Sequence, residues 1–164
     1  MTEIRVGGAH DLEQLNEIYN HYVRTSPCTF DIEEVSMDAR REWFTHYATT
    51  GRHRLFVVED AGAVVGYAIS SPFMERRAYE TSVSTSVYCA PEHTGRGLGS
   101  ALYRVLFDAI SDEDLHRAYA GITQPNDASV ALHKSFGFKQ VAWFSEQGRK
   151  FDRYWDVAWF EKEL

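Results

Sequence analysis

Apolar residues recur along the chain at two periods, and the changes between the two periods predict its elements. A short β-like run at 4–6 comes first, and apolar residues at helical spacing follow Asp11. Asp11 and Gln14 are spaced as in a capping box, which predicts that the side chain of Asp11 caps this helix. Pro27 breaks the helix, and Ser36 is placed to cap a second, amphipathic one. The apolar face of that second helix is expected to bury Trp43, Phe44 and Tyr47.

The rest of the chain alternates between strand-like and helix-like runs. Two apolar runs around a glycine-containing turn predict a β-hairpin over 54–73, and a long β-rich stretch over 79–91 follows it. The later elements are predicted to be a helix over 101–109, a strand over 117–122, a helix between Asn126 and Gly137, and strands over 139–147 and 151–164. The order β-α-α-β-β-β-α-β-α-β-β, without a repeat or a linker, predicts one mixed α/β domain over 1–164.

The composition narrows the classes of protein without choosing among them. A length of 164 residues and an apolar content of 44% suit one globular domain with a sizeable core. The net charge of -7 argues against general nucleic-acid binding, and no apolar run approaches the ~20 residues of a membrane span. Cys28 and Cys89 form no disulfide framework and match no zinc spacing, so we expect a reduced, cytoplasmic protein without a metal.

Three glycines precede the predicted helix over 101–109, where bare backbone has an evident use. Glycine inside a helix costs roughly 0.5–1 kcal/mol relative to alanine, so Gly95, Gly97 and Gly99 need a reason to be there. The first turn of a helix offers unpaired N–H groups and about half a positive charge, which together suit a phosphate group. Arg96 adds a side-chain charge. The spacing fits neither a P-loop nor the Rossmann fingerprint.

The segment 87–110, VYCAPEHTGRGLGSALYRVLFDAI, resembles the pyrophosphate-binding motif of the GNAT superfamily of N-acetyltransferases. That motif has the form Gln/Arg-x-x-Gly-x-Gly/Ala, and Thr94 stands here where Gln or Arg is usual. The segment 126–138, NDASVALHKSFGF, is similar to a second signature of the superfamily. The likeness extends over 4–160 and follows the branch that contains phosphinothricin and methionine sulfoximine acetyltransferases.

The resemblance implies the GNAT fold, a twisted, mixed and mostly antiparallel sheet flanked by about four helices, with acetyl-CoA as cosubstrate. The pyrophosphate would rest on the amides of 95–100, and the pantetheine arm would pair with the preceding strand as an extra strand. Asn126 would contact the cofactor near its sulfur. The resemblance assigns cofactor contacts to Val87, Tyr88, Cys89, Thr94, Gly95, Arg96, Gly97, Leu98, Gly99, Ser100, Asn126 and Ser129.

Acetyl transfer to an amine needs a proton acceptor, a polarised carbonyl and a proton for the leaving thiolate. The branch uses a strand glutamate as the base, and Ser84 stands at that position here. Four alternatives are open: Glu80 acting through water from the same strand face, His133 acting with water, an amine that arrives partly neutral, or weak or lost catalysis. We place His133 ahead of Glu80. Tyr103 either packs in the core or reaches the thiol, and Cys89 either packs as an apolar residue or carries the acetyl group.

The residues that would hold the acceptor amine are predicted mainly from the resemblance. An arginine suits a substrate carboxylate because its planar guanidinium binds both oxygens. Arg76 and Arg77 are candidates for this role, and the alternative is that they are solvated surface charges. The segment 148–157 resembles a branch segment that closes the site from a partner subunit, which implies a homodimer. Asp152 replaces a glycine of that segment and adds a negative charge that disfavours an acidic substrate. The acceptor residues predicted in this way are Phe30, Arg76, Arg77, Tyr79 and Lys150.

We therefore expect an acetyl-CoA-dependent N-acetyltransferase that acts on a small-molecule amine, an amino acid or an analogue such as phosphinothricin or methionine sulfoximine. Two alternatives stay open. One is the same fold acting on a polyamine, an arylamine or a peptide N-terminus. The other is a non-catalytic acyl-CoA-binding module, in which Ser84 marks the loss of the base. The second signature over 126–138 argues against an unrelated nucleotide-binding protein.

Overall fold

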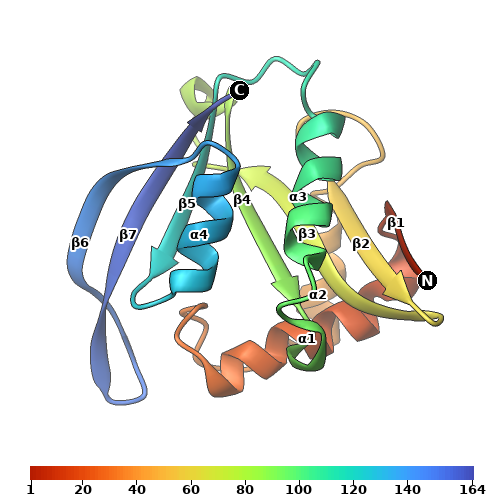
Figure 1. Ribbon diagram of the computed structural model, residues 1–164, viewed down its shortest axis with the longest axis horizontal. Helices are drawn as coiled ribbons and strands as arrows, with labels where there is room; N and C mark the ends of the chain where they lie inside the picture. The colour runs from red at the N-terminus through yellow and green to blue at the C-terminus, as the bar shows by residue number, and fades with distance from the viewer.

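The computed structural model describes residues 1–164, which fold around one seven-stranded sheet (Figure 1). The strands are β1 (Thr2–Val6), β2 (Leu55–Asp60), β3 (Ala63–Pro72), β4 (Ser82–Cys89), β5 (Arg117–Thr123), β6 (Lys139–Lys150) and β7 (Arg153–Glu163). The helices are α1 (Leu12–Thr25), α2 (Met37–Phe44), α3 (Leu98–Ala109) and α4 (Asp127–Ser135), with short 3-10 turns η1 (Ala9–Asp11), η2 (Arg77–Tyr79) and η3 (Pro91–His93). The predicted order of strands and helices is confirmed, and none of the helices is long and apolar enough to cross a membrane.

Different helices cover the two faces of the sheet, as the alternation of β2 shows. Leu55 and Val57 pack with α1, whereas Phe56 and Val58 point to the other face and pack with α3. Helix α2 joins the α1 face, where Trp43 packs against the same cluster. Helix α4 lies beside α3 on the opposite face (Figure 1). The core is therefore divided into layers on either side of one sheet, as is usual for a mixed α/β domain.

The centre of the sheet opens where its two parallel strands separate. The strand order is β1-β2-β3-β4-β5-β7-β6, and only β4 and β5 are parallel neighbours. They pair over three residues, from Ser82 to Ser84 with Arg117 to Tyr119, and then diverge (Figure 1). We call this point the fork. Beyond the fork, the edge of β4 that faces β5 and the edge of β5 that faces β4 have no neighbouring strand. The backbone groups along these two edges are therefore free to bind another chain-like molecule.

The predicted capping box at the start of α1 is wrong. Asp11 makes no side-chain cap to this helix; its carboxylate accepts from the guanidinium of Arg5 at 2.8 Å and from the N–H of Gly8 at 2.8 Å. Gln14 instead accepts the N–H of Val64 on β3 at 2.7 Å. A two-point contact between two charged groups is stronger than a single bond from a backbone N–H, so Arg5 decides where this carboxylate points.

The predicted strand over 79–91 begins too early. β4 starts at Ser82, because the preceding residues form the turn η2 and its C-cap, Glu80. The ring of Tyr79 packs edge-on against Phe73 at 6.0 Å, and the carboxylate of Glu80 lies 3.6 Å from the guanidinium of Arg77. Glu80 therefore does not share a strand face with the residue at the catalytic position, contrary to the expectation from the sequence.

Candidate active site

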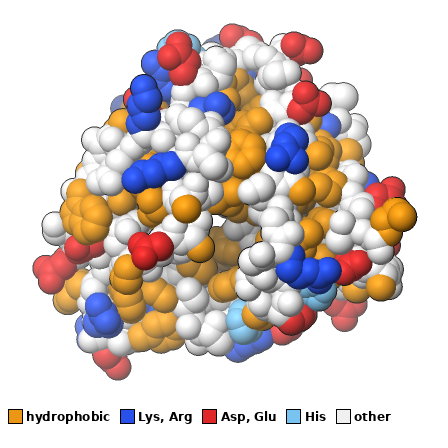
Figure 2. Space-filling view, viewed as in Figure 1, with side chains coloured by type: hydrophobic (Ala, Val, Ile, Leu, Met, Phe, Trp, Pro, Cys, Tyr) orange, Lys and Arg blue, Asp and Glu red, His pale blue; other side chains and the backbone are white.

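A cleft of about 530 Å³ occupies the fork and the space between α3 and α4. Figure 2 shows it as a hollow at the centre of the face. Residues from the end of α1, β4, the glycine loop, β5 and the start of α4 line it. Of the predicted cofactor residues, the cleft brings together Val87, Tyr88, Cys89, Thr94, Gly95, Gly97, Leu98, Gly99, Asn126 and Ser129. Arg96 and Ser100 do not line it, and the guanidinium of Arg96 faces the carboxylate of Asp60 at 3.4 Å.

Two of the three glycines in the loop allow a left-handed backbone, and the third allows close packing against α4. Gly95 and Gly97 have φ angles of 73° and 78°, a left-handed backbone that favours glycine, and a Cβ on either would enter open space. Gly99 instead allows close packing, because a Cβ there would lie 3.3 Å from a methyl of Leu132 on α4. The first amide of α3 that finds a backbone acceptor is that of Ala101, which donates to the carbonyl of Gly97 at 3.1 Å. The amides of 95–100 are therefore left for an anion, as helix N-termini allow.

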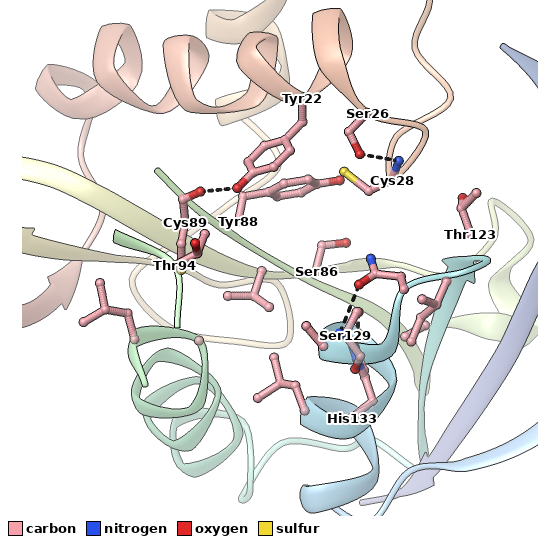
Figure 3. Close-up of a pocket in the computed structure, with 18 of the residues that line it drawn as sticks. Tyr22, Ser26, Cys28, Ser86, Tyr88, Cys89, Thr94, Thr123, Ser129 and His133 are labelled. Carbon is pink, nitrogen blue, oxygen red and sulfur yellow. Dashed lines mark hydrogen bonds between the residues drawn. The ribbon is translucent and has the colours of Figure 1, made fainter. Parts of the chain in front are cut away.

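The free edge of β4 suits an extended ligand. The N–H of Ala90 donates to the carbonyl of Val65 on β3 at 2.8 Å. Since backbone groups alternate in direction along an antiparallel strand, the N–H and C=O groups of Val87 and Cys89 turn toward the cleft. The hydroxyl of Tyr22 on α1 donates to the carbonyl of Cys89, which leaves the groups of Val87 open (Figure 3).

The N-terminus of α4 is fixed by a chain of hydrogen bonds that ends inside the core. The Asn126 side chain accepts the N–H of Ser129 at 3.1 Å, as the predicted N-cap requires. His133, with 4% of its surface exposed, has Nδ1 2.7 Å from the carbonyl of Ser129 and Nε2 3.0 Å from the hydroxyl of Tyr103. A carbonyl only accepts, so we assign the proton to Nδ1, and the Tyr103 hydroxyl then donates to Nε2. Both ring nitrogens are engaged, and Tyr103 lies in the core.

The burial of His133 gives the stability of the fold a pH dependence. Burial lowers the pKa of the ring from its ordinary 6.5, so below about pH 6.5 the unfolded chain binds a proton that the folded protein does not. This contribution is complete above that pH and is lost as the pH falls, with a slope of up to about 1.4 kcal/mol per pH unit. We expect His133→Gln to reduce the pH dependence of the free energy of unfolding between pH 6.5 and 5. The free energy is measured by urea unfolding at each pH. The exposed His116, changed to Gln, should leave the slope as in the parent protein; equal slopes in all three proteins would contradict the assignment.

The position of the missing base lies just inside the fork. Ser84 is half-buried and pairs with Ser71 on β3 and Tyr119 on β5. Ser84 does not itself line the cleft, but Ser86, two residues further on the same face, does. Glu80 is exposed on the turn η2 and lies outside the cleft. The cleft therefore holds hydroxyl groups where the resemblance leads one to expect a carboxylate.

The predicted acceptor residues are divided between the surface and the interior. Arg76 and Arg77 are exposed in the β3–β4 connection, and neither they nor Tyr79 line the cleft. Phe30 lies in the α1–α2 loop, residues 26–36, and its ring packs against the backbone of Gly148 on β6. A Cβ on Gly148 would overlap that ring, so this position requires glycine by close approach.

Lys150 holds the same loop from the other side. Its side chain is almost fully buried, with 4% of the residue exposed. The ammonium donates to the carbonyl oxygens of Ser26 and Thr29, each at 2.9 Å. Burial lowers the pKa of this ammonium. Lys150 thus positions the loop that borders the cleft, and its charge is directed at the backbone of that loop.

Several residues that line the cleft belong to no motif in the sequence and were not predicted. Tyr22 and Cys28 enter from the end of α1 and the loop after it, Ser86 from β4 and Thr123 from β5 (Figure 3). Gly121 also lines the cleft from β5. Extending the period-2 alternation of β4 beyond Ser84 would have pointed to Ser86. The other four are brought in by the packing of α1 and by the divergence of β5, which no short segment reveals.

The two thiols of the cleft are poor nucleophiles. Burial raises the pKa of Cys28, and it raises the pKa of Cys89 to about 11. A thiol with a raised pKa is protonated at neutral pH, whereas nucleophilic attack needs the thiolate. The protonated state of both thiols therefore favours direct transfer over an acetyl-cysteine intermediate. No group of three or more His, Cys, Asp or Glu side chains is arranged to hold a metal ion.

Comparison with known proteins agrees with this geometry. Residues 4–159 match the family model described as an acetyltransferase (GNAT) domain, so the chain belongs to the GNAT acetyltransferases. It is 53% identical over 165 residues to a phosphinothricin N-acetyltransferase of Streptomyces coelicolor, covering 99% of this chain and 96% of that one. It is 33% identical over 161 residues to an L-methionine sulfoximine/L-methionine sulfone acetyltransferase of Salmonella typhimurium, covering 98% and 94%. The crystal structure of a GNAT superfamily phosphinothricin acetyltransferase from Sinorhizobium meliloti in complex with AcCoA has a TM-score of 0.94 at 30% identity, covering 99% and 88%.

The chain is thus an acetyltransferase with acetyl-CoA as its cosubstrate, and its own residues fit that molecule. The unpaired amides of 95–100 suit a pyrophosphate, and the open edge at Val87 suits the amide groups of a pantetheine arm. Asn126 and Ser129 stand where α4 meets the cleft.

Proposed function

We propose that this protein transfers the acetyl group of acetyl-CoA to the amine of a small molecule, an amino acid or an analogue of the kind that phosphinothricin and methionine sulfoximine represent. The observation that carries the proposal is the fork. It joins a row of unpaired amides at one end to an opening between the α1–α2 loop and β5 at the other. The relatives named for these two substrates cover nearly the whole chain, which supports the same substrate class.

In this proposal, the residues of the cleft bind and orient both reactants. The amides of 95–100 hold the pyrophosphate, and Val87 holds the pantetheine arm through its backbone. The acceptor enters beside Cys28 and Thr123, so that its nitrogen meets the acetyl carbonyl at the fork. Acetyl-CoA supplies an activated acyl group with a thiolate as leaving group. Proximity and orientation within the cleft are then the main contributions of the protein to the rate.

The proposal is tested by thiol release from acetyl-CoA with a panel of amines between pH 6 and 9. The panel contains phosphinothricin, methionine sulfoximine, common amino acids, polyamines and arylamines. Release with amino acids or their analogues is the expected result. Release only with another amine would replace the substrate class, and tight CoA binding without release for any amine would favour the non-catalytic module.

We further propose that the protein is a homodimer and that β6 and β7 form its interface. Large apolar side chains on these two strands and their turn are between 48% and 57% exposed: Val141, Trp143, Phe144, Phe151 and Tyr154. So many exposed apolar side chains at one edge of the sheet are more than a small monomer normally leaves in water. β6 is also an edge strand of the sheet, with unpaired backbone groups along its outer side.

We expect Trp143→Glu to convert the dimer into a monomer, because a carboxylate would be buried against the apolar partner surface. The measurement is the molar mass in solution by light scattering at micromolar concentrations. Ile32, an exposed apolar residue outside β6 and β7, gives the matched control, and Ile32→Glu should remain a dimer. A parent protein that is already monomeric under these conditions would refute the interface.

A further inference from the structure

A carboxylate stands beside the phosphate end of the cleft, where negative charge works against the ligand. Asp60 is the last residue of β2, and this strand ends at the side of the sheet where the glycine loop lies (Figure 1). The Oδ2 atom of Asp60 lies 3.4 Å from the guanidinium of Arg96 and 4.0 Å from Nε2 of His93. The same carboxylate therefore faces a side chain of the glycine loop and a side chain that lines the cleft.

Arg96 is turned away from the cleft, although both of its neighbours line it. Gly95 and Gly97 border the cleft, and their left-handed backbone places the amides of the loop at the anion site. Arg96 lies between these glycines, does not line the cleft and donates to Asp60. The backbone of the loop and its one charged side chain are thus directed at different partners.

The shape of the glycine loop does not depend on Asp60. At the start of the loop, the hydroxyl of Thr94 donates to the carbonyl of Pro91 at 2.9 Å. At its end, the N–H of Ala101 donates to the carbonyl of Gly97 at 3.1 Å. These contacts hold both ends of the loop through its own chain, so a side chain of the loop is able to exchange its partner while the backbone stays in place.

The ion pair between Arg96 and Asp60 is weak. Its N–O distance is 3.4 Å, and the two side chains are 50% and 20% exposed. A pair in contact with water gains little, because both groups give up hydration and side-chain freedom to form it. The pair between Arg5 and Asp11 differs in both respects, with two contacts of 2.8 Å and a carboxylate that is 2% exposed. Arg96 is therefore held loosely enough for a stronger anion to take it.

The phosphate groups of CoA are stronger partners for Arg96 than Asp60 is. The pyrophosphate and the 3′-phosphate carry several negative charges between them, and a guanidinium binds a phosphate through two parallel N–H bonds. The pyrophosphate is expected on the amides of 95–100, within the loop that carries Arg96. A phosphate there attracts the guanidinium and is repelled by the carboxylate of Asp60.

We propose that Asp60 competes with a phosphate group of CoA for Arg96 and thereby limits the affinity of the protein for acetyl-CoA and CoA. On binding, the guanidinium leaves Asp60 for the phosphate, and Asp60 takes it back when CoA departs. Since CoA must leave after each transfer, a limited affinity favours turnover. The inference goes beyond the proposed function, because it concerns the cosubstrate and holds for any acceptor amine.

The first test is the affinity of Asp60→Asn for CoA, measured by isothermal titration without an acceptor. The amide keeps the size of the side chain and removes the charge that holds Arg96. An exposed ion pair is worth at most a factor of about five in an equilibrium constant, so we expect the Kd for CoA to fall about threefold to fivefold. An unchanged Kd would show that Asp60 does not compete, and a raised Kd would show that it prepares the loop for CoA; either result overturns the inference.

Glu59→Gln is the matched control for the change in net charge. Glu59 precedes Asp60 on β2, points to the opposite face of the sheet, and accepts from the guanidinium of Arg5 at 2.9 Å. Its replacement removes one negative charge without affecting a contact of Arg96. We expect this variant to bind CoA as the parent does. An equal fall of Kd in both variants would reveal a general effect of net charge and refute a particular role of Asp60.

A double-mutant cycle separates competition for Arg96 from simple repulsion between Asp60 and the phosphate. Arg96→Gln should raise the Kd for CoA at least about threefold, the range of one exposed charged contact. Adding Asp60→Asn to Arg96→Gln should then give no further gain in affinity, because no guanidinium is left to release. A full gain in that background, or a parent-like Kd for Arg96→Gln alone, would rule out the exchange of Arg96.

Dephospho-CoA identifies the phosphate that receives Arg96, since it lacks the 3′-phosphate and keeps the pyrophosphate. An equal gain from Asp60→Asn for CoA and for dephospho-CoA would support competition with the pyrophosphate. A gain for CoA alone would support competition with the 3′-phosphate. No gain for either molecule contradicts competition at both positions.

Discussion

Gly97→Glu should weaken CoA binding at least 100-fold, a loss of about 2.7 kcal/mol. Gly97 precedes α3 with a φ angle of 78°, and a side chain there would project into open space beside the unpaired amides of 95–100. A carboxylate at this place repels the pyrophosphate and occupies the positive end of the helix dipole. Isothermal titration with CoA measures the affinity directly and does not depend on identifying the acceptor.

A control variant must show that Gly97→Glu lowers CoA affinity through the loss of the anion site and not through the strain of a side chain at positive φ. Gly51 has a φ angle of 88° and open space around its Cβ, and it contacts Glu113 beyond the C-terminal end of α3, far from the cleft. Gly51→Glu therefore repeats the backbone strain and the added charge without reaching the site. Similar CoA affinity in the two variants, both folded, would show that the loop does not cradle the pyrophosphate.

The geometry of the glycine loop and of the start of α4 was predictable from the sequence because its determinants are local. Gly95 and Gly97 act through their own backbone angles, and Asn126 caps α4 through a residue only three positions away. Ser36 caps α2 in the same local way, by accepting the N–H of Ala39 at 3.2 Å. Contacts of this range depend on spacing along the chain, which a sequence displays directly.

The errors arise where another contact outcompetes the one that the spacing predicts. Asp11 fits the spacing of a capping box, but Arg5 and Gly8, on the preceding strand and turn, bind its carboxylate instead. Glu80 fits an unbroken strand, but the packing of Tyr79 on Phe73 turns the chain before β4 begins. In both places the alternative contact spans only three to six residues, but it forms in a turn that apolar periodicity does not report.

The predicted catalytic and acceptor residues could not be placed from the sequence, because their partners lie far from them along the chain. His133 was expected to offer a free ring nitrogen, yet Tyr103, thirty residues earlier, occupies one of them. Lys150 was expected near the substrate, and the structure directs its ammonium to a loop more than a hundred residues earlier in the chain. Side chains of the expected types are present, but their partners decide what they are free to do.

The position of Lys150 leads to the second large effect. Lys150→Met keeps the length of the side chain but removes the donor that binds the carbonyls of Ser26 and Thr29. Leaving buried acceptors unpaired costs roughly 1–3 kcal/mol for each group, so we expect the free energy of unfolding to fall by about 2–6 kcal/mol. Because the released loop carries Cys28 at the acceptor side of the cleft, KM for the acceptor should rise while the Kd for CoA stays the same.

Urea unfolding gives the stability change, and steady-state kinetics together with titration of CoA separates the two binding sites. The neighbouring Arg149 provides the matched control, since its side chain is 60% exposed and its guanidinium lies 3.4 Å from the carboxylate of Asp152 and 6.0 Å from the ring centre of Tyr154. Arg149→Met should change the free energy of unfolding by less than about 0.5 kcal/mol, as expected for a surface ion pair. If Lys150→Met behaved like this control, the two hydrogen bonds to the loop would contribute nothing to the fold. If Lys150→Met weakened the binding of CoA and of the acceptor equally, the loop would support the whole cleft and not only its acceptor side.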